Sequence, residues 1–124
     1  LHLLLVEDNA LNAEIAAALL ADRGVSVELA RDGSEAVRMF REAPAGTYAG
    51  IIMDIMMPVM DGLTATRAIR ALERADAKTI PIIAMTANAF EEDARQCLAA
   101  GMNVHLAKPL CMEELVAILA RLCA

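Results

Sequence analysis

Aromatic residues are scarce in this sequence, whose 124 residues include no Trp, one Tyr and two Phe. The interior must therefore be filled by Leu, Ile, Val, Ala and the eight Met residues, and we expect an aliphatic core. A hydrophobic fraction of 58% beside a charged fraction of 23% argues against intrinsic disorder. A chain of this length is expected to form one domain that folds without a disulfide or a metal.

Basic residues are also few, with 11 Lys and Arg against 17 Asp and Glu, which gives a formal net charge of −6 at pH 7. Nucleic-acid affinity comes chiefly from cationic side chains, so nucleic-acid binding is not expected. No apolar run approaches the roughly 20 residues of a membrane span, and the start of the chain lacks the basic residues of a signal peptide. We expect a domain without membrane contact, either cytoplasmic or in the cytosolic part of a membrane-bound protein.

The three cysteines, Cys97, Cys111 and Cys123, have neither the number nor the spacing of a disulfide framework or a zinc site. The chain starts without Met and stops just after an amphipathic run. Residues 1–124 are therefore interpreted as one domain excised from a longer protein.

Short apolar runs recur along the chain, each followed by a segment with helical spacing, at residues 3–6, 25–29, 50–53, 80–85 and 104–106. Most are continuously apolar, which is typical of parallel strands covered on both faces. Residues 25–29 instead alternate between apolar and polar, which is typical of an edge strand. The pattern predicts a flavodoxin-like, doubly wound α/β fold, a (βα)5 unit whose parallel sheet has the order 2-1-3-4-5 and helices on both faces.

Apolar residues at helical spacing indicate five helices between and after these runs. The residues that share a face are Leu11, Ile15 and Leu19; Ala36, Val37 and Phe40; Ala65, Ile69 and Leu72; Phe90, Ala94, Cys97 and Leu98; and Leu115, Ile118, Leu119 and Leu122. Gly24 and Gly101 stand where the first and fourth of these helices should end, a position that favours glycine.

Acidic residues follow two of the expected strands, Glu7 and Asp8 after the first and Asp54 after the third. Functional residues of open parallel sheets gather at the carboxyl ends of the strands, so the three carboxylates should converge. Their mutual repulsion calls for a neutralising cation, and oxygen-only ligands favour a hard ion such as Mg²⁺. We therefore expect a magnesium site at this edge of the sheet.

Two further polar side chains are expected at the same edge, because Thr86 ends the fourth expected strand and Lys108 follows the fifth. A hydroxyl and an ammonium group can both hold phosphoryl oxygens. Together with a metal and a carboxylate nucleophile, they are the groups that phosphoryl transfer onto a carboxylate requires. Asp54 lies between the metal pair and this second pair, and is the expected acceptor.

With these elements the whole chain resembles the receiver (response-regulator) domains of two-component phosphorelay systems. The resemblance rests on four segments in order and at suitable spacing, Val6-Glu7-Asp8-Asn9, residues 53–62 (MDIMMPVMDG), Met85-Thr86-Ala87 and Ala107-Lys108-Pro109. It implies that Asp54 takes a phosphoryl group from a phosphohistidine of a histidine kinase or a histidine phosphotransfer domain. Such a domain catalyses its own aspartyl phosphorylation and dephosphorylation, and is not a turnover enzyme by itself.

The resemblance also assigns roles to single residues. It implies that the backbone carbonyl of Met56 joins the acidic residues around Mg²⁺, and that Thr86 and Lys108 contact the phosphoryl group. The Lys108-Pro109 peptide bond is typically cis in the family. The segment from Asn88 to Pro109 is most similar to receivers of hybrid sensor histidine kinases.

A conformational switch is also implied, in which Thr86 moves toward the phosphoryl group and the residue three before the lysine turns inward. The signal would leave through the surface of the fourth helix, the fifth strand and the fifth helix, or the phosphoryl group would be relayed onward. The inward-turning residue is usually aromatic, whereas here it is His105. We hypothesise that His105 fills this role less hydrophobically, which comparing His105→Tyr with the parent for phosphorylation-induced chemical shifts would test. A half-buried imidazole with a purely structural role is the alternative.

Two other functions are weighed against this interpretation. A haloacid-dehalogenase-like phosphohydrolase also forms an aspartyl phosphate, but it has a second Asp two residues after the nucleophile, where this chain has Met56. A receiver that acts as a phosphorylation-independent interaction module is the other alternative. The complete set of acceptor residues argues against it.

Overall fold

The computed structural model describes residues 1–55, 59–86, 91–107 and 111–123, and within them five parallel strands form one sheet. The strands are β1 (His2–Val6), β2 (Ser26–Ala30), β3 (Gly50–Asp54), β4 (Ile82–Thr86) and β5 (Val104–Ala107). Their order is β2-β1-β3-β4-β5, with β2 at an edge. The fold class, the strand order and the edge position of the alternating strand are thus confirmed.

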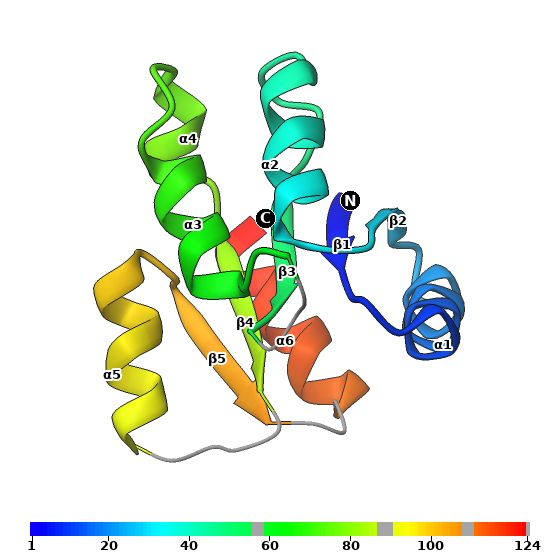
Figure 1. Ribbon diagram of the computed structural model, residues 1–124. Coiled ribbons are helices and arrows are strands. Elements are labelled where there is room, and N and C mark those ends of the chain that lie inside the picture. The colour runs from blue at the N-terminus through cyan, green and yellow to red at the C-terminus, as the bar shows by residue number, and fades with distance from the viewer. Residues whose placement is uncertain (56–58, 87–90, 108–110, 124) are drawn as a thin grey trace.

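Helices cover both faces of the sheet (Figure 1). They are α1 (Ala10–Ala21), α2 (Gly33–Glu42), α3 (Gly62–Arg70), α4 (Ala75–Thr79), α5 (Glu91–Ala100) and α6 (Met112–Cys123). Helices α2 to α5 contribute buried side chains to the core on one face, whereas α1 and α6 contribute to the core on the other. No helix in the described part of the chain is long and apolar enough to cross a membrane.

Two largely aliphatic clusters form the core, one on each face of the sheet. Every residue of β3 and of β4 is buried, because both strands lie inside the sheet and are covered from both sides. This double burial explains their continuously apolar sequences. Phe40 is the one aromatic residue among the largest fully buried side chains of the described residues, as the composition predicts.

Helix α4 was not predicted from the sequence, because five residues are too few to show an apolar stripe. It is held by Arg74, which immediately precedes it and lies 2.7 Å from the Asp76 carboxylate. The Arg74 guanidinium also donates hydrogen bonds to the Phe40 and Ala43 carbonyl oxygens, at 3.0 and 2.9 Å, at the end of α2. These contacts join residues that are far apart in the sequence, so no local sequence pattern indicates the helix.

Two glycines end helices as predicted. Gly24, with φ +77°, follows α1, and Gly101, with φ +109°, follows α5. In each case the next residue donates a hydrogen bond back into the helix, from Val25 to the Leu20 carbonyl and from Met102 to the Cys97 carbonyl, both at 3.0 Å. The left-handed backbone that glycine permits thus turns the chain toward the following strand.

Three of the four large apolar residues of α1 face outward. Leu11, Ile15 and Leu19 are 65, 50 and 40% exposed, whereas the buried residues of this helix are Ala13 and Leu20. An apolar stripe on a helix normally packs on the core. Helix α1 is apolar on nearly all sides, so a different face, rich in alanine, lies against the sheet and the predicted stripe is left exposed.

Candidate functional site

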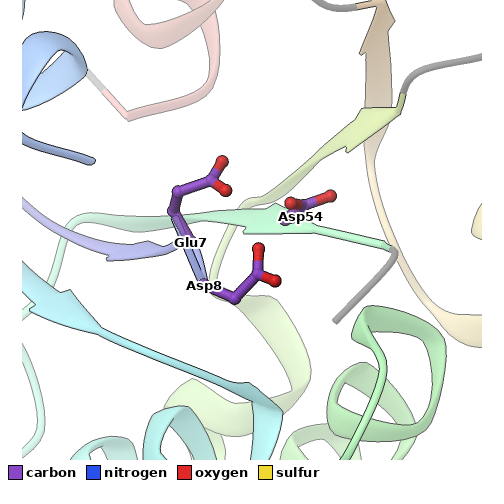
Figure 2. Close-up of side chains that lie close together, drawn as sticks. All are labelled: Glu7, Asp8 and Asp54. Carbon is purple, nitrogen blue, oxygen red and sulfur yellow. The ribbon is translucent and has the colours of Figure 1, made fainter. Parts of the chain in front are cut away.

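Three carboxylates converge at the carboxyl edge of the sheet, as predicted. Figure 2 shows the side chains of Glu7 and Asp8, which follow β1, beside that of Asp54, the last residue of β3. One carboxylate oxygen from each lies within 4.8 Å of the others. Within the described residues, this is the group of His, Cys, Asp and Glu side chains whose geometry could hold a metal ion.

The sheet register brings these residues together. Strands β1 and β3 are parallel neighbours in which Val6 is opposite Met53, so the residue after each of them reaches the same edge. Glu7 and Asp54 are buried, whereas Asp8 is exposed. The Glu7 carboxylate accepts a hydrogen bond from the Asn9 backbone N–H at 3.2 Å, which orients it at the start of α1.

The donor set of this acidic cluster fits a hard divalent cation. All three donors are carboxylate oxygens, and two of the three side chains are buried. The oxygens of an octahedral Mg²⁺ ion, about 2.1 Å from the metal, are about 3 to 4 Å apart. Oxygens within 4.8 Å of one another reach that arrangement with small side-chain shifts. A bound cation would also relieve the repulsion among the three negative charges.

Thr86 lies at the same edge as the acidic cluster. It is the buried last residue of β4, and its neighbour Met85 is opposite Asp54 on β3. Ala107, the last residue of β5, is opposite Thr86, and His105 is a half-buried residue opposite Ala84. The structure therefore brings Thr86 to the edge where Asp54 ends its strand, and places His105 further back in the sheet.

Three of the predicted site residues, Met56, Lys108 and Pro109, lie outside the described residues. Their roles, including the cis peptide bond, stay predictions. The inward turn of His105 also stays a prediction.

The described residues between Asp54 and α3 are Ile55 and 59–61, called here the loop, and they make backbone contacts with α2 and α3. The Gly62 N–H donates to the Ile55 carbonyl at 2.9 Å, and a Cβ atom at Gly62 would lie 2.4 Å from the Asp54 carbonyl oxygen. The loop also contacts Gly33 of α2, whose N–H donates to the Met60 carbonyl at 3.1 Å. Gly33 was not predicted from the sequence, although its place as a glycine directly after the helix-capping Asp32 is a recognisable signal.

A family model for the response regulator receiver domain matches residues 3–120 of this chain. The chain belongs to that family. This receiver domain is 46% identical, with a TM-score of 0.87, to the receiver domain of the sensor histidine kinase PA1611 from Pseudomonas aeruginosa PAO1. The match covers 98% of this chain and 96% of that one, whose crystal structure has a magnesium ion coordinated in the active-site cleft.

Two other relatives belong to signalling systems of the same kind. The receiver domain is 45% identical over 93% of its length to the hybrid signal transduction histidine kinase G of Dictyostelium discoideum. It spans 3% of that protein's length, and 14 and 17% of the lengths of two other curated relatives. It is also 30% identical, with a TM-score of 0.86, to a chain in the co-crystal structure of the Saccharomyces cerevisiae histidine phosphotransfer protein Ypd1 and the receiver domain of Ssk1. That match covers 99% of this chain and 88% of the other.

These comparisons confirm the predicted family and its likeness to the receivers of hybrid histidine kinases. They place the chain among the receiver domains of two-component systems. The haloacid-dehalogenase-like alternative gains no support from them.

Proposed function

We propose that this receiver domain accepts a phosphoryl group on Asp54 from a phosphohistidine of a partner protein, with Mg²⁺ held by Glu7, Asp8 and Asp54. The convergence of the three carboxylates, with oxygens within 4.8 Å of one another at the edge of the sheet, carries this proposal. The family match and the magnesium ion in the Pseudomonas aeruginosa relative support it. The proposed ligands also include the Met56 backbone carbonyl.

The proposed reaction needs little from the protein beyond placement and charge. An oxygen of the Asp54 carboxylate forms a bond to phosphorus while the bond from phosphorus to the imidazole nitrogen breaks, and its electron pair returns to the imidazole. The Thr86 hydroxyl donates a hydrogen bond to a phosphoryl oxygen, and the Lys108 ammonium offsets the charge of the product. When bound, Mg²⁺ supplies further compensation for the negative charge on the carboxylates and the phosphoryl group.

The proposed donor is a histidine phosphotransfer domain or the histidine-bearing domain of a kinase. A protein donor has to cover the surface around Asp54 to bring its phosphohistidine into reach. Helix α1 begins two residues after Asp8 and exposes Leu11, Ile15 and Leu19, and contiguous exposed apolar residues mark interaction surfaces. We assign this stripe to the donor. The co-crystal structure of Ypd1 with the Ssk1 receiver domain supports a histidine phosphotransfer protein as the kind of partner. A cytoplasmic location, as predicted from the sequence, is part of this proposal.

Phosphorylation by a small phosphodonor tests the proposal. The parent and Asp54→Asn are incubated with the donor and Mg²⁺ and then compared by intact-mass analysis, with Asp22→Asn, which changes an exposed acid at the end of α1, as the control. We expect one added phosphoryl group in the parent and in Asp22→Asn, and none in Asp54→Asn. Modification of Asp54→Asn would place the acceptor elsewhere. An unmodified parent would contradict the proposal and favour an interaction module that works without phosphorylation.

A further inference from the structure

The segment that joins β2 to α2 makes one backbone hydrogen bond to Glu7 and another to the loop after Asp54. At its start, the Ala30 carbonyl accepts a hydrogen bond from the Glu7 N–H at 3.0 Å. At its end, the Gly33 N–H donates to the Met60 carbonyl at 3.1 Å. One stretch of four residues, called here the β2–α2 segment, thus ties the carboxyl end of β1 to the loop that follows Asp54 (Figure 1).

Gly33 packs against this loop without room for a side chain. A Cβ atom at Gly33 would lie 2.5 Å from the Met60 carbonyl oxygen and 2.9 Å from the Ala65 Cβ, closer than such atoms approach in proteins. The Asp32 side chain accepts a hydrogen bond from the Glu35 N–H at 2.9 Å and caps α2, so the first turn of the helix fixes the position of Gly33. The close approach is therefore built into the start of α2.

The loop that Gly33 contacts needs external support. Val59 has φ +69° and is 87% exposed, and a β-branched residue adopts this left-handed conformation only where its surroundings enforce it. Ile55 donates a backbone hydrogen bond to the Met85 carbonyl oxygen at 3.1 Å, and the side chains of Ile55 and Met60 pack against the core. Two backbone hydrogen bonds from glycines add to these contacts. Gly62 of α3 bonds to Ile55, and Gly33 of α2 bonds to Met60.

We propose that the β2–α2 segment is a positioning element that holds the loop after Asp54 in place relative to Glu7 and Asp8, and thereby sets the affinity for Mg²⁺. Gly33 acts through the backbone of the loop, since its bond goes to the Met60 carbonyl. Residues that orient metal ligands from outside the ligand shell typically change metal affinity by about 10 to 100-fold when they are replaced. The effect on Mg²⁺ rests on the proposed function, whereas the support of the loop does not.

Two changes at Gly33 test the positioning element. Gly33→Ala adds the Cβ atom that meets Met60, and an amide-to-ester replacement at residue 33 removes the N–H donor without adding a side chain. Ser34→Ala, an exposed neighbour, is the local control, and Ala36→Gly, a buried residue of α2, is the control for general loss of stability. Amide hydrogen exchange of Gly62 is measured relative to that of Ile52 in β3, and Mg²⁺ affinity is measured by calorimetric titration.

Both Gly33 variants are expected to speed Gly62 exchange relative to Ile52 and to weaken Mg²⁺ binding by about tenfold or more, whereas both controls leave these two quantities near the parent values. If Gly33→Ala does not fold, amide exchange and Mg²⁺ affinity are both measured on the ester variant. Unchanged Gly62 exchange in a folded Gly33 variant would overturn the proposal. Faster exchange with parental Mg²⁺ affinity would overturn it too, because the segment would then be only structural. A parent that binds no Mg²⁺ would instead contradict the proposed function, while the exchange measurement would still decide whether the segment supports the loop.

Discussion

Tyr48, the one tyrosine of the chain, is a buried residue whose ionisation depends on its neighbours. Its ring stacks on that of His2, with the ring centroids 5.6 Å apart. Burial, and secondarily a hydrogen bond to Glu28, raise the pKa of Tyr48 to about 12. The hydrogen bond from Tyr48, followed by that from His2, lowers the pKa of Glu28. His2 and Tyr48 lie near the amino ends of β1 and β3, and Glu28 lies in the middle of β2, away from the acidic cluster at the carboxyl edge of the sheet.

Alkaline titration checks this pKa directly, since the chain has no Trp and its near-ultraviolet tyrosinate absorbance reports Tyr48 alone. We expect a midpoint near 12 in the folded protein, against about 10 in the unfolded chain. Because the folded pKa is the higher one, the contribution of Tyr48 to stability is complete below about pH 10 and falls as the pH rises toward 12. Glu28→Gln should lower the midpoint, and the exposed Glu73→Gln should not. A midpoint at the unfolded value would contradict the expectation.

Individual residues also show how far the site could be predicted from the sequence. Glu7, Asp8 and Asp54 were found because strand ends are recognisable and parallel strands place their carboxyl ends at one edge. Gly33 was missed because its contribution is a backbone contact with Met60, and no side-chain chemistry marks it.

At the scale of elements, the strands that are buried along their whole length were the easiest to predict from the sequence. Strands β3 and β4, buried along their whole length, show the clearest apolar runs, and their position in the sheet followed from the repeated pattern. Helix α4 depends on the contact between Arg74 and the end of α2, which is distant in the sequence, so no local periodicity predicted this helix. The orientation of α1 was ambiguous because apolar residues lie on nearly all sides of it. Which of its faces meets the sheet is decided by packing, not by its own sequence.

The exposed face of α1 leads to a prediction about donor binding. Ile15→Glu should slow phosphotransfer from a protein donor by at least about tenfold, because a charge would be buried at the centre of an apolar contact. The matched control is Leu98→Glu, which places the same charge at an exposed apolar position of α5, on the other face of the sheet. Phosphorylation by a small donor should stay near the parent rate in both variants. Equal rates of transfer from the protein donor to Ile15→Glu and to the parent would remove α1 from the proposed interface.

The whole molecule combines a net charge of −6 with three carboxylates gathered at one edge of the sheet. Glu7 and Asp8 are far from Asp54 in the sequence, so the acidic cluster exists only in the folded chain. A cation that binds this cluster therefore stabilises the fold, whereas the unfolded chain offers no equivalent site.

Urea unfolding with and without Mg²⁺ measures this linkage. At a Mg²⁺ concentration of about 100 times the dissociation constant, the free energy of unfolding should rise by about 2.7 kcal/mol. Asp8→Asn should lose this response, and without Mg²⁺ it should be more stable than the parent because one of three repelling charges is gone. Asp22→Asn, away from the acidic cluster, should respond as the parent does. An equal response in Asp8→Asn would show that the ion binds elsewhere, and a sodium salt at matched ionic strength controls for general screening.

The separation of α1 into a buried face and an exposed apolar face has a consequence for divergence among signalling pathways. Ala13 and Leu20 anchor the helix to the sheet, while Leu11, Ile15 and Leu19 project from its outer side. Substitutions on that outer side leave the interior untouched. Under the proposed donor contact, duplicated copies of such a gene can therefore diverge toward different donors while their folding is preserved. Insulation between parallel pathways then requires changes at only a few surface positions.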